Sequence, residues 1–233
     1  MMSRVLLIGC CVVSPSLAAQ SISLQGRVAF PLSSSQVGVA FDSSGRHRLI
    51  DRGGGVWGGL ALEARVVGFS ASVTGLRGGL GDSNGMFPAR DGGEVSALVR
   101  YEVHPGIALE TRHTTRVFVS AAGRQQWVAW GIGVLGSRKL GSEFVHASGA
   151  IEYLPIVRIT GGVNPSFGIA ADLALTVMPR RTPVVLSAGY RIEKFSFPDI
   201  TYRAEQFEVL TLSLGVRMQR QDGRWTLTNR GGQ

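Results

Sequence analysis

Five stretches of the chain alternate apolar and polar residues with a period of two, and in nearly all of them the polar positions include charged side chains. Residues 94–103 show the alternation most clearly, with Val95 and Val99 on one row and Arg100 and Glu102 on the other. Successive side chains of a β-strand point to opposite faces of the sheet. The pattern therefore predicts a sheet with one apolar face and one charged face.

Segments rich in glycine, proline and polar residues separate the alternating stretches and predict ten strands. The expected strands are residues 21–30, 56–66, 69–77, 94–103, 107–120, 127–136, 144–153, 167–178, 184–195 and 207–218. Proline cannot donate a hydrogen bond to a sheet ladder, so prolines should lie between strands. The prolines assigned to turns and loops are Pro31, Pro88, Pro105, Pro155, Pro165, Pro179, Pro183 and Pro198. Segments 31–55 and 154–165 are ambiguous, so eight strands remain an alternative to ten.

The first residues have the form of an export signal. Arg4 precedes an apolar run over residues 5–13 and a small-residue exit over residues 14–20, which predicts cleavage after Ala18 or Ala19, so that the mature chain begins near Gln20. Residues 1–19 are then a signal peptide, residues 20–218 a barrel domain and residues 219–233 a polar C-terminal tail. Cys10 also fits a lipid-modification pattern, as an alternative. Because both cysteines lie in the signal, the exported chain can form no disulfide.

The apolar rows carry no charge, whereas the opposite rows carry opposite charges, often two residues apart. The charged residues expected to face an enclosed lumen are Glu63, Arg65, Arg100, Glu102, Glu110, Arg112, Asp172, Arg191, Glu193 and Arg217. A slip of one residue would turn each arginine toward hydrocarbon, at about 2 to 4 kcal/mol near the bilayer midplane. We expect these arginines and carboxylates to form a salt-bridged plug.

Aromatic residues lie near the ends of the expected strands, where the two interfaces of a membrane would be. They are Trp57, Trp127, Trp130, Tyr101, Tyr153, Phe30, Phe167, Phe195 and Phe207. Tyr190 lies in the middle of a strand and does not fit this pattern.

The formal net charge of +8 does not indicate a nucleic-acid-binding protein. Such proteins concentrate positive charge on one face or helix, whereas arginine is spread along this chain and often lies two residues from a glutamate. His47, His104 and His113 have no partner at the spacing of a metal site, so we expect neither a metal nor another cofactor.

The chain resembles the small bacterial outer-membrane barrels of the outer-membrane protein A, X and W kind. The resemblance covers essentially the whole mature chain and rests on the strand pattern. It implies an all-β fold, a closed antiparallel up-and-down transmembrane β-barrel of about ten strands in the bacterial outer membrane. It also implies contact with outer-membrane lipid, with lipopolysaccharide and with the barrel assembly machinery. In that family the final strand usually ends on an aromatic residue, whereas here it is expected to end at Met218.

These features favour a structural, surface-interaction or narrow-channel role and not an enzyme, with the extracellular partner left open. A second hypothesis is an outer-membrane lipid A acyl hydrolase, because His146, Ser148 and Glu152 share one inward face. His146 and Ser148 resemble the His-x-Ser motif of lipid A deacylases, in which asparagine follows where this chain has Gly149. A third is a secreted soluble β-sandwich that binds a partner through its loops. Strands of about nine to twelve residues, against a usual five or six, favour the barrel.

Overall fold

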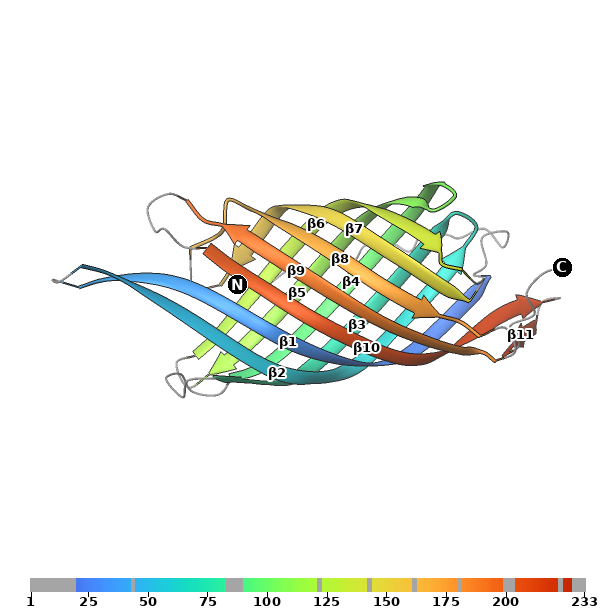
Figure 1. Ribbon diagram of the computed structural model, residues 1–233, viewed down its shortest axis with the longest axis horizontal. Coiled ribbons are helices and arrows are strands. Elements are labelled where there is room, and N and C mark those ends of the chain that lie inside the picture. Colours follow the sequence, from blue (N-terminus) through green and yellow to red (C-terminus); the bar gives the residue numbers. More distant parts are fainter. Residues whose placement is uncertain are drawn as a thin grey trace, which may run out of the picture.

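In a computed structural model the chain forms a single β-sheet that closes on itself (Figure 1). The structure describes residues 20–42, 45–82, 90–120, 123–141, 144–160, 163–179, 182–198, 204–221 and 224–227. The expected signal peptide, with Cys10, lies outside the described residues. The strands are β1 (Ser21–Asp42), β2 (Gly45–Val66), β3 (Phe69–Asp82), β4 (Arg90–His104), β5 (Ile107–Ser120), β6 (Gly123–Lys139), β7 (Val145–Ile159), β8 (Phe167–Val177), β9 (Val184–Ser196), β10 (Ala204–Gln221) and β11 (Arg224–Thr226).

The prediction of a closed antiparallel barrel with ten strands is confirmed. Each strand pairs with its neighbours in sequence, and β1 pairs with β10 from Ser21 opposite Gln219 to Gln36 opposite Glu205. This last pairing leaves neither of the two strands as a free edge, as closure requires. The eight-strand alternative and the soluble β-sandwich are therefore wrong. The short β11, which pairs with the end of β10, was not expected and lies in the polar tail.

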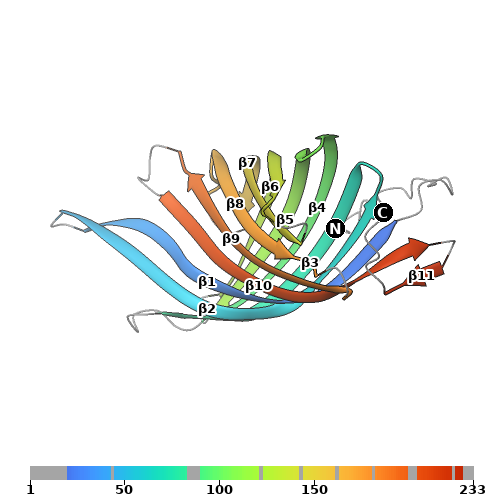
Figure 2. The same ribbon diagram turned by 45° about the vertical axis from the view of Figure 1, so that its right-hand side comes forward.

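The two ambiguous segments lengthen predicted strands and add no new ones. Residues 31–42 belong to β1 and residues 45–55 to β2, and the two strands continue together beyond the rest of the barrel as a hairpin that ends with Asp42 opposite Gly45 (Figures 1 and 2). Residues 154–159 continue β7. Both extensions lie at the same end of the barrel.

Two of the prolines assigned to connections lie inside strands. The pairing of β1 with β10 changes register just after Pro31. The pairing of β6 with β7 changes register at Gly131, which faces the part of β7 that contains Pro155. A β-bulge leaves one residue without a ladder partner, so a missing N–H group is tolerated there. The expectation that every proline marks a gap between strands was wrong for these two.

The two ends of the barrel differ. At one, which we call the turn end, two-residue turns join β2 to β3 and β4 to β5, and the described chain begins at Gln20. Gly68 and Gly106 lie in these turns with positive φ angles of 72° and 82°, which glycine adopts without a steric penalty. At the other, which we call the loop end, seven-residue connections follow β3, β7 and β9.

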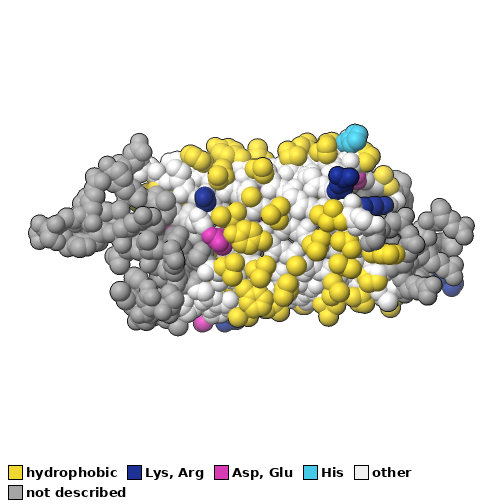
Figure 3. Space-filling view, in the orientation of Figure 1, with side chains coloured by type: hydrophobic (Ala, Val, Ile, Leu, Met, Phe, Trp, Pro, Cys, Tyr) yellow, Lys and Arg dark blue, Asp and Glu magenta, His cyan; other side chains and the backbone are white. Residues whose placement is uncertain are grey.

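The apolar rows face outward, as the alternation predicts. Leu60 is 62% exposed and Leu173 is 64% exposed, whereas Glu152 is only 1% exposed. Hydrophobic side chains cover the middle of the surface in Figure 3, where charged side chains are few. Charge lies inside and apolar surface outside, which is the reverse of a soluble protein. Among the described residues, no helix is long and apolar enough to span a membrane.

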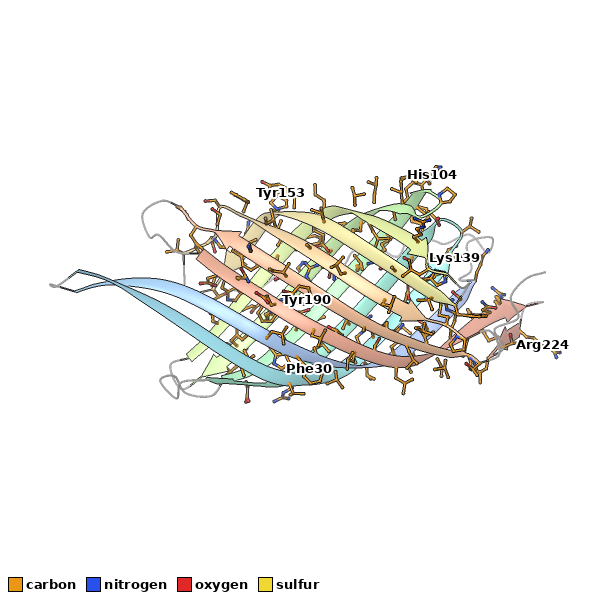
Figure 4. The ribbon with its side chains drawn as sticks, in the orientation of Figure 1. Phe30, His104, Lys139, Tyr153, Tyr190 and Arg224 are labelled. Carbon is orange, nitrogen blue, oxygen red and sulfur yellow. The ribbon has the colours of Figure 1, made fainter. Side chains whose placement is uncertain are left out.

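The aromatic residues divide between the outer surface and the lumen. Phe69 contacts Tyr101 on the outside near the turn end, with ring centroids 4.6 Å apart. Tyr153 projects from the outer surface and contacts Phe167, with centroids 6.1 Å apart (Figure 4). The expected interface position is wrong for four residues that are buried in the lumen. These four are Trp57, Trp127, Phe195 and Phe207.

Candidate functional site

A network of arginines and carboxylates crosses the lumen at about half its height. Glu152 on β7 accepts hydrogen bonds from Arg112 Nε at 2.8 Å and from Arg191 Nη1 at 2.8 Å. Arg191 Nη2 also donates to Glu152 Oε2 at 3.1 Å. Both arginines donate to Asp172 as well, Arg112 through Nη2 at 3.2 Å and Arg191 through Nη1. These four side chains come from four different strands, so they link several parts of the wall.

Arg116 extends the network across the barrel. Its Nη1 donates to Glu193 at 3.0 Å, and its Nε and Nη2 donate to Glu94 at 2.9 and 2.7 Å. Glu193 also accepts from Arg191 Nε at 2.7 Å, which joins the two parts of the network. Arg116 lies on β5 and Glu193 on β9, with three strands between them. The bond therefore crosses the interior.

The other expected lumen charges lie closer to the turn end. Arg100 Nε donates to Glu110 at 2.9 Å, and Arg65 Nε donates to Glu63 at 2.8 Å. Glu102 is exposed and accepts from the backbone N–H of Gly106 at 3.3 Å. Arg217 forms no ion pair with a described residue, although it lines the lumen.

The list of expected lumen charges omitted Glu94, Arg116 and Arg27, and it considered Glu152 only as a catalytic residue. The sequence contained the signal for three of these residues. Glu94, Arg116 and Glu152 each lie an even number of residues from an expected inward residue of the same strand, as Arg116 does from Arg112. Arg27 lies on a strand for which no inward residue was predicted. Apart from Asp172 and Arg217, the alternation was applied only where opposite charges lie two residues apart, and that criterion was too narrow.

An aromatic and aliphatic layer lies in the lumen on the loop-end side of the charges. Trp57 and Phe207 belong to one apolar cluster, Trp127 and Phe195 belong to another, and Phe118 packs against both. The ring centroids of Trp57 and Phe207 are 6.0 Å apart, and those of Trp127 and Phe195 are 5.2 Å apart. Arg116 joins this layer to the charged one, because its guanidinium carbon lies 3.7 Å from the Phe207 ring centroid.

Glycines of the wall make room for the largest of these side chains. A Cβ atom at Gly92 would lie 2.4 Å from the Trp57 ring, and one at Gly78 would lie 2.7 Å from it. A Cβ atom at Gly168 would lie 2.9 Å from the ring of Phe195. The glycines therefore allow the rings to lie flat against the wall, which explains how Trp57 reaches 0% exposure.

A cavity of about 550 Å³ occupies the part of the lumen between the charged network and the turn end. Its lining includes Gly68, Gly106 and Ser137 at the turn end and reaches Trp57 and Arg116 toward the loop end. We call this cavity the vestibule.

The structure places His146 and Ser148 in the wall of the vestibule, on the inward row of β7. Their side chains share no hydrogen bond, with each other or with another described residue. Glu152 is on the same row, but both of its oxygens accept hydrogen bonds from Arg112 and Arg191. Glu152 is thus bound to arginines and does not orient His146.

Three carboxylates come close enough together to be considered as metal ligands. The oxygens of Glu110, Glu152 and Asp172 lie within 4.8 Å of one another. Arg100, Arg112 and Arg191 donate to these same carboxylates. The negative charge that would attract a cation is therefore already neutralised, and the cluster is better described as part of the ion-pair network.

No family model matches this chain, and no curated protein matches it. Among solved structures, the outer membrane protease OmpT from Escherichia coli is similar, with a TM-score of 0.51 and 10% sequence identity over 88% of this chain and 98% of that one. The translocator domain of the autotransporter NalP from Neisseria meningitidis gives a TM-score of 0.44 and 10% identity over 86% of this chain and 88% of that one. The similarity to OmpT shows that this chain has the fold of a bacterial outer-membrane β-barrel.

Proposed function

We propose that the protein resides in a bacterial outer membrane as a barrel with a closed lumen, and that it acts in a structural or surface-interaction role and not as a general pore. The observation that supports the proposal is the presence of two layers of side chains in the lumen, one charged and one apolar. The ion pair between Arg116 and Glu193 crosses the interior, and the layer around Phe118 covers it on the loop-end side. Such a role agrees with the small barrels of the outer-membrane protein A, X and W kind that the sequence resembles.

Membrane residence is supported by the outer surface. Burying a leucine or valine side chain away from water is worth about 1.5 to 3 kcal/mol, and the outward rows leave many such side chains exposed. A bilayer removes this cost, and all backbone polar groups of a closed barrel are paired between strands. Outer-membrane lipid and lipopolysaccharide are then the direct neighbours of the barrel, and the barrel assembly machinery is the expected route of insertion.

The difference between the two ends supports an orientation. Barrels of this class have short periplasmic turns and longer extracellular loops. The turn end would therefore face the periplasm, and the loop end with the β1–β2 hairpin would face outward. An extracellular partner would meet the protein there.

Conductance in planar bilayers tests the closed lumen. We expect the refolded protein to show no steps of the size that a general porin gives. Replacing both layers at once, with Arg116→Ala and Phe118→Ala, should produce measurable steps, whereas Arg138→Ala should not because Arg138 is exposed on the outward row of β6. Folding of each variant is checked by heat-modifiable migration on a gel. Porin-sized steps from the unmodified protein would contradict the proposal.

We further propose that the protein is not an enzyme. The lipid A hydrolase hypothesis needs Glu152 to orient His146, and the two arginines bound to Glu152 do not favour that arrangement. Incubation of the purified barrel with lipid A should leave the mass of the lipid unchanged. Loss of an acyl chain that depends on Ser148 would refute this part of the proposal.

A further inference from the structure

Two neighbouring residues on the inward row of β1 have polar atoms without a partner in the vestibule. Gln25 is 7% exposed, and its Oε1 accepts no hydrogen bond from any described residue. Arg27 comes two residues later, and its Nε donates to no described residue. Both side chains line the vestibule. A buried acceptor or donor without a partner destabilises the fold.

Arg27 differs from the arginines around it. Arg100, Arg112 and Arg116 each form an ion pair with a carboxylate, whereas Arg27 donates through Nη1 to the Thr74 hydroxyl at 3.0 Å. Glu63 and Glu94 are the carboxylates near enough to attract it, and both already accept from other arginines. Among the described residues, the charge of Arg27 is therefore not matched by a carboxylate of its own. It provides a cation at the inner end of the vestibule.

The wall around this cation is rich in hydroxyl groups, which both donate and accept hydrogen bonds. The inward-facing hydroxyl residues of the wall include Ser72, Thr74, Ser96, Ser187, Thr211 and Ser213. The vestibule volume of about 550 Å³ lies within the range of about 300 to 1,000 Å³ that is typical of small-molecule sites. A cation at the bottom, an unpaired acceptor beside it and hydroxyls around both define the chemistry of a ligand.

We infer that the vestibule binds a small sugar that carries an oxyanion, entering from the turn end. The oxyanion would accept from the guanidinium of Arg27, in the charge-assisted geometry that guanidinium groups provide for carboxylates and phosphates. Hydroxyls of the sugar would exchange hydrogen bonds with the hydroxyl groups of the wall. For Gln25 Oε1 to accept from the sugar, the amide must turn toward the cavity. The carboxylate and phosphate forms share this chemistry, so the experiment includes both.

Because the proposed lumen is closed, a ligand would bind in the vestibule without passing through the barrel. The ion pairs of Arg116 and the rings beyond it lie between the vestibule and the loop end. A ligand that enters from the turn end would leave by the same route. The inference goes beyond the proposed function and is tested by binding, whereas the closed lumen is tested by conductance.

Isothermal titration of the refolded full barrel in detergent micelles tests the inference directly. The probes are glucose 6-phosphate, glucuronate, inorganic phosphate and glucose. We expect saturable binding of one or both of the charged sugars, with glucose and inorganic phosphate at least tenfold weaker. Arg27→Gln should weaken binding about tenfold to a hundredfold, as loss of a charge-assisted hydrogen bond implies. Arg27→Lys should weaken binding less than Arg27→Gln does, because lysine keeps the positive charge.

Arg138→Gln is the matched control, since it removes the same charge from the outer surface. It should bind as the unmodified protein does. A thiol reagent provides a second readout, because the expected mature chain contains no cysteine and Ser72→Cys would place one in the vestibule wall. The charged sugar should slow its modification. If neither charged sugar binds at 10 mM, or if Arg138→Gln weakens binding as much as Arg27→Gln, the inference is wrong.

Discussion

Removal of the Arg116 side chain should destabilise the barrel more than removal of any exposed arginine. Arg116 is 4% exposed, contacts Glu94 and Glu193 through three hydrogen bonds, and lies over the ring of Phe207. Breaking a buried ion pair by removing one partner costs about 3 to 5 kcal/mol, because the other charge remains buried. Loss of the cation–π contact adds about 0.5 to 2 kcal/mol. We therefore expect Arg116→Ala to lower the free energy of unfolding by at least about 3 kcal/mol.

Urea titration of the refolded barrel in lipid vesicles measures this effect, with the folded fraction followed by gel migration and by tryptophan fluorescence. The matched control is Arg65→Ala, because Arg65 also pairs with a glutamate, at 2.8 Å, but its side chain is 47% exposed. Exposed pairs contribute about 0 to 1 kcal/mol. Equal losses of stability for the two variants would show that the buried ion pairs of Arg116 contribute no more to stability than the exposed pair of Arg65.

A double variant separates the ion pair from simple loss of packing. Glu94 accepts hydrogen bonds from Arg116 and from no other described residue, so Arg116→Ala leaves it unpaired. Adding Glu94→Gln removes that buried charge and should recover part of the loss, with a coupling of about 0.5 to 3 kcal/mol. Strictly additive effects would mean that the two residues do not interact.

Two further predictions concern the wall of the barrel. Leu173→Arg, on the outward row of β8, should reduce stability in vesicles by about 2 to 4 kcal/mol, whereas Val67→Arg at the turn end should cost about 0 to 1 kcal/mol in the same urea titration. Gly92→Ala should cost about 1 to 3 kcal/mol and shift the tryptophan emission, because the added Cβ would overlap the ring of Trp57. Gly58→Ala is its control, since a Cβ there would meet nothing within 4 Å, and similar losses at both glycines would contradict the packing argument.

Much of the architecture was predictable because strand alternation is a local property. In the strand of residues 94–103, for example, the row of Val95 is apolar and the row of Arg100 is charged. The sequence of this strand shows which face is apolar, without knowledge of the neighbouring strands. All ten expected strands are present, and the inward charges follow from the same period. The inward aromatics follow from it too, since Trp57 shares its row with Glu63 and Arg65. The inward direction of these aromatic side chains was not predicted, because their position near a strand end outweighed their place on the inward-facing row of the strand.

The ends of the strands and the bulges were less predictable. From the sequence of one strand alone, Pro31 and Pro155 each predict the end of a strand. The neighbouring strands nevertheless pair with residues on both sides of these prolines and keep them in the sheet. A bulge depends on the pairing of two strands, and one strand's sequence does not contain that information. The extension of β1 and β2 beyond the barrel likewise depends on the pairing of the two strands with each other.

Two ion pairs, Arg65–Glu63 and Arg191–Glu193, follow from spacing along one strand, but the tertiary structure decided the others. Sequence spacing places Glu102 beside Arg100 and Glu110 beside Arg112, but Arg100 pairs with Glu110 and Arg112 pairs with Glu152. Arg116 and Glu193 are 77 positions apart in the chain, and they meet because closure places β5 across the lumen from β9. The sequence alone thus determined which residues face inward, because side-chain direction alternates along each strand. Only the closed barrel decided which of them meet, because contact across a lumen depends on the registers of all the strands between them.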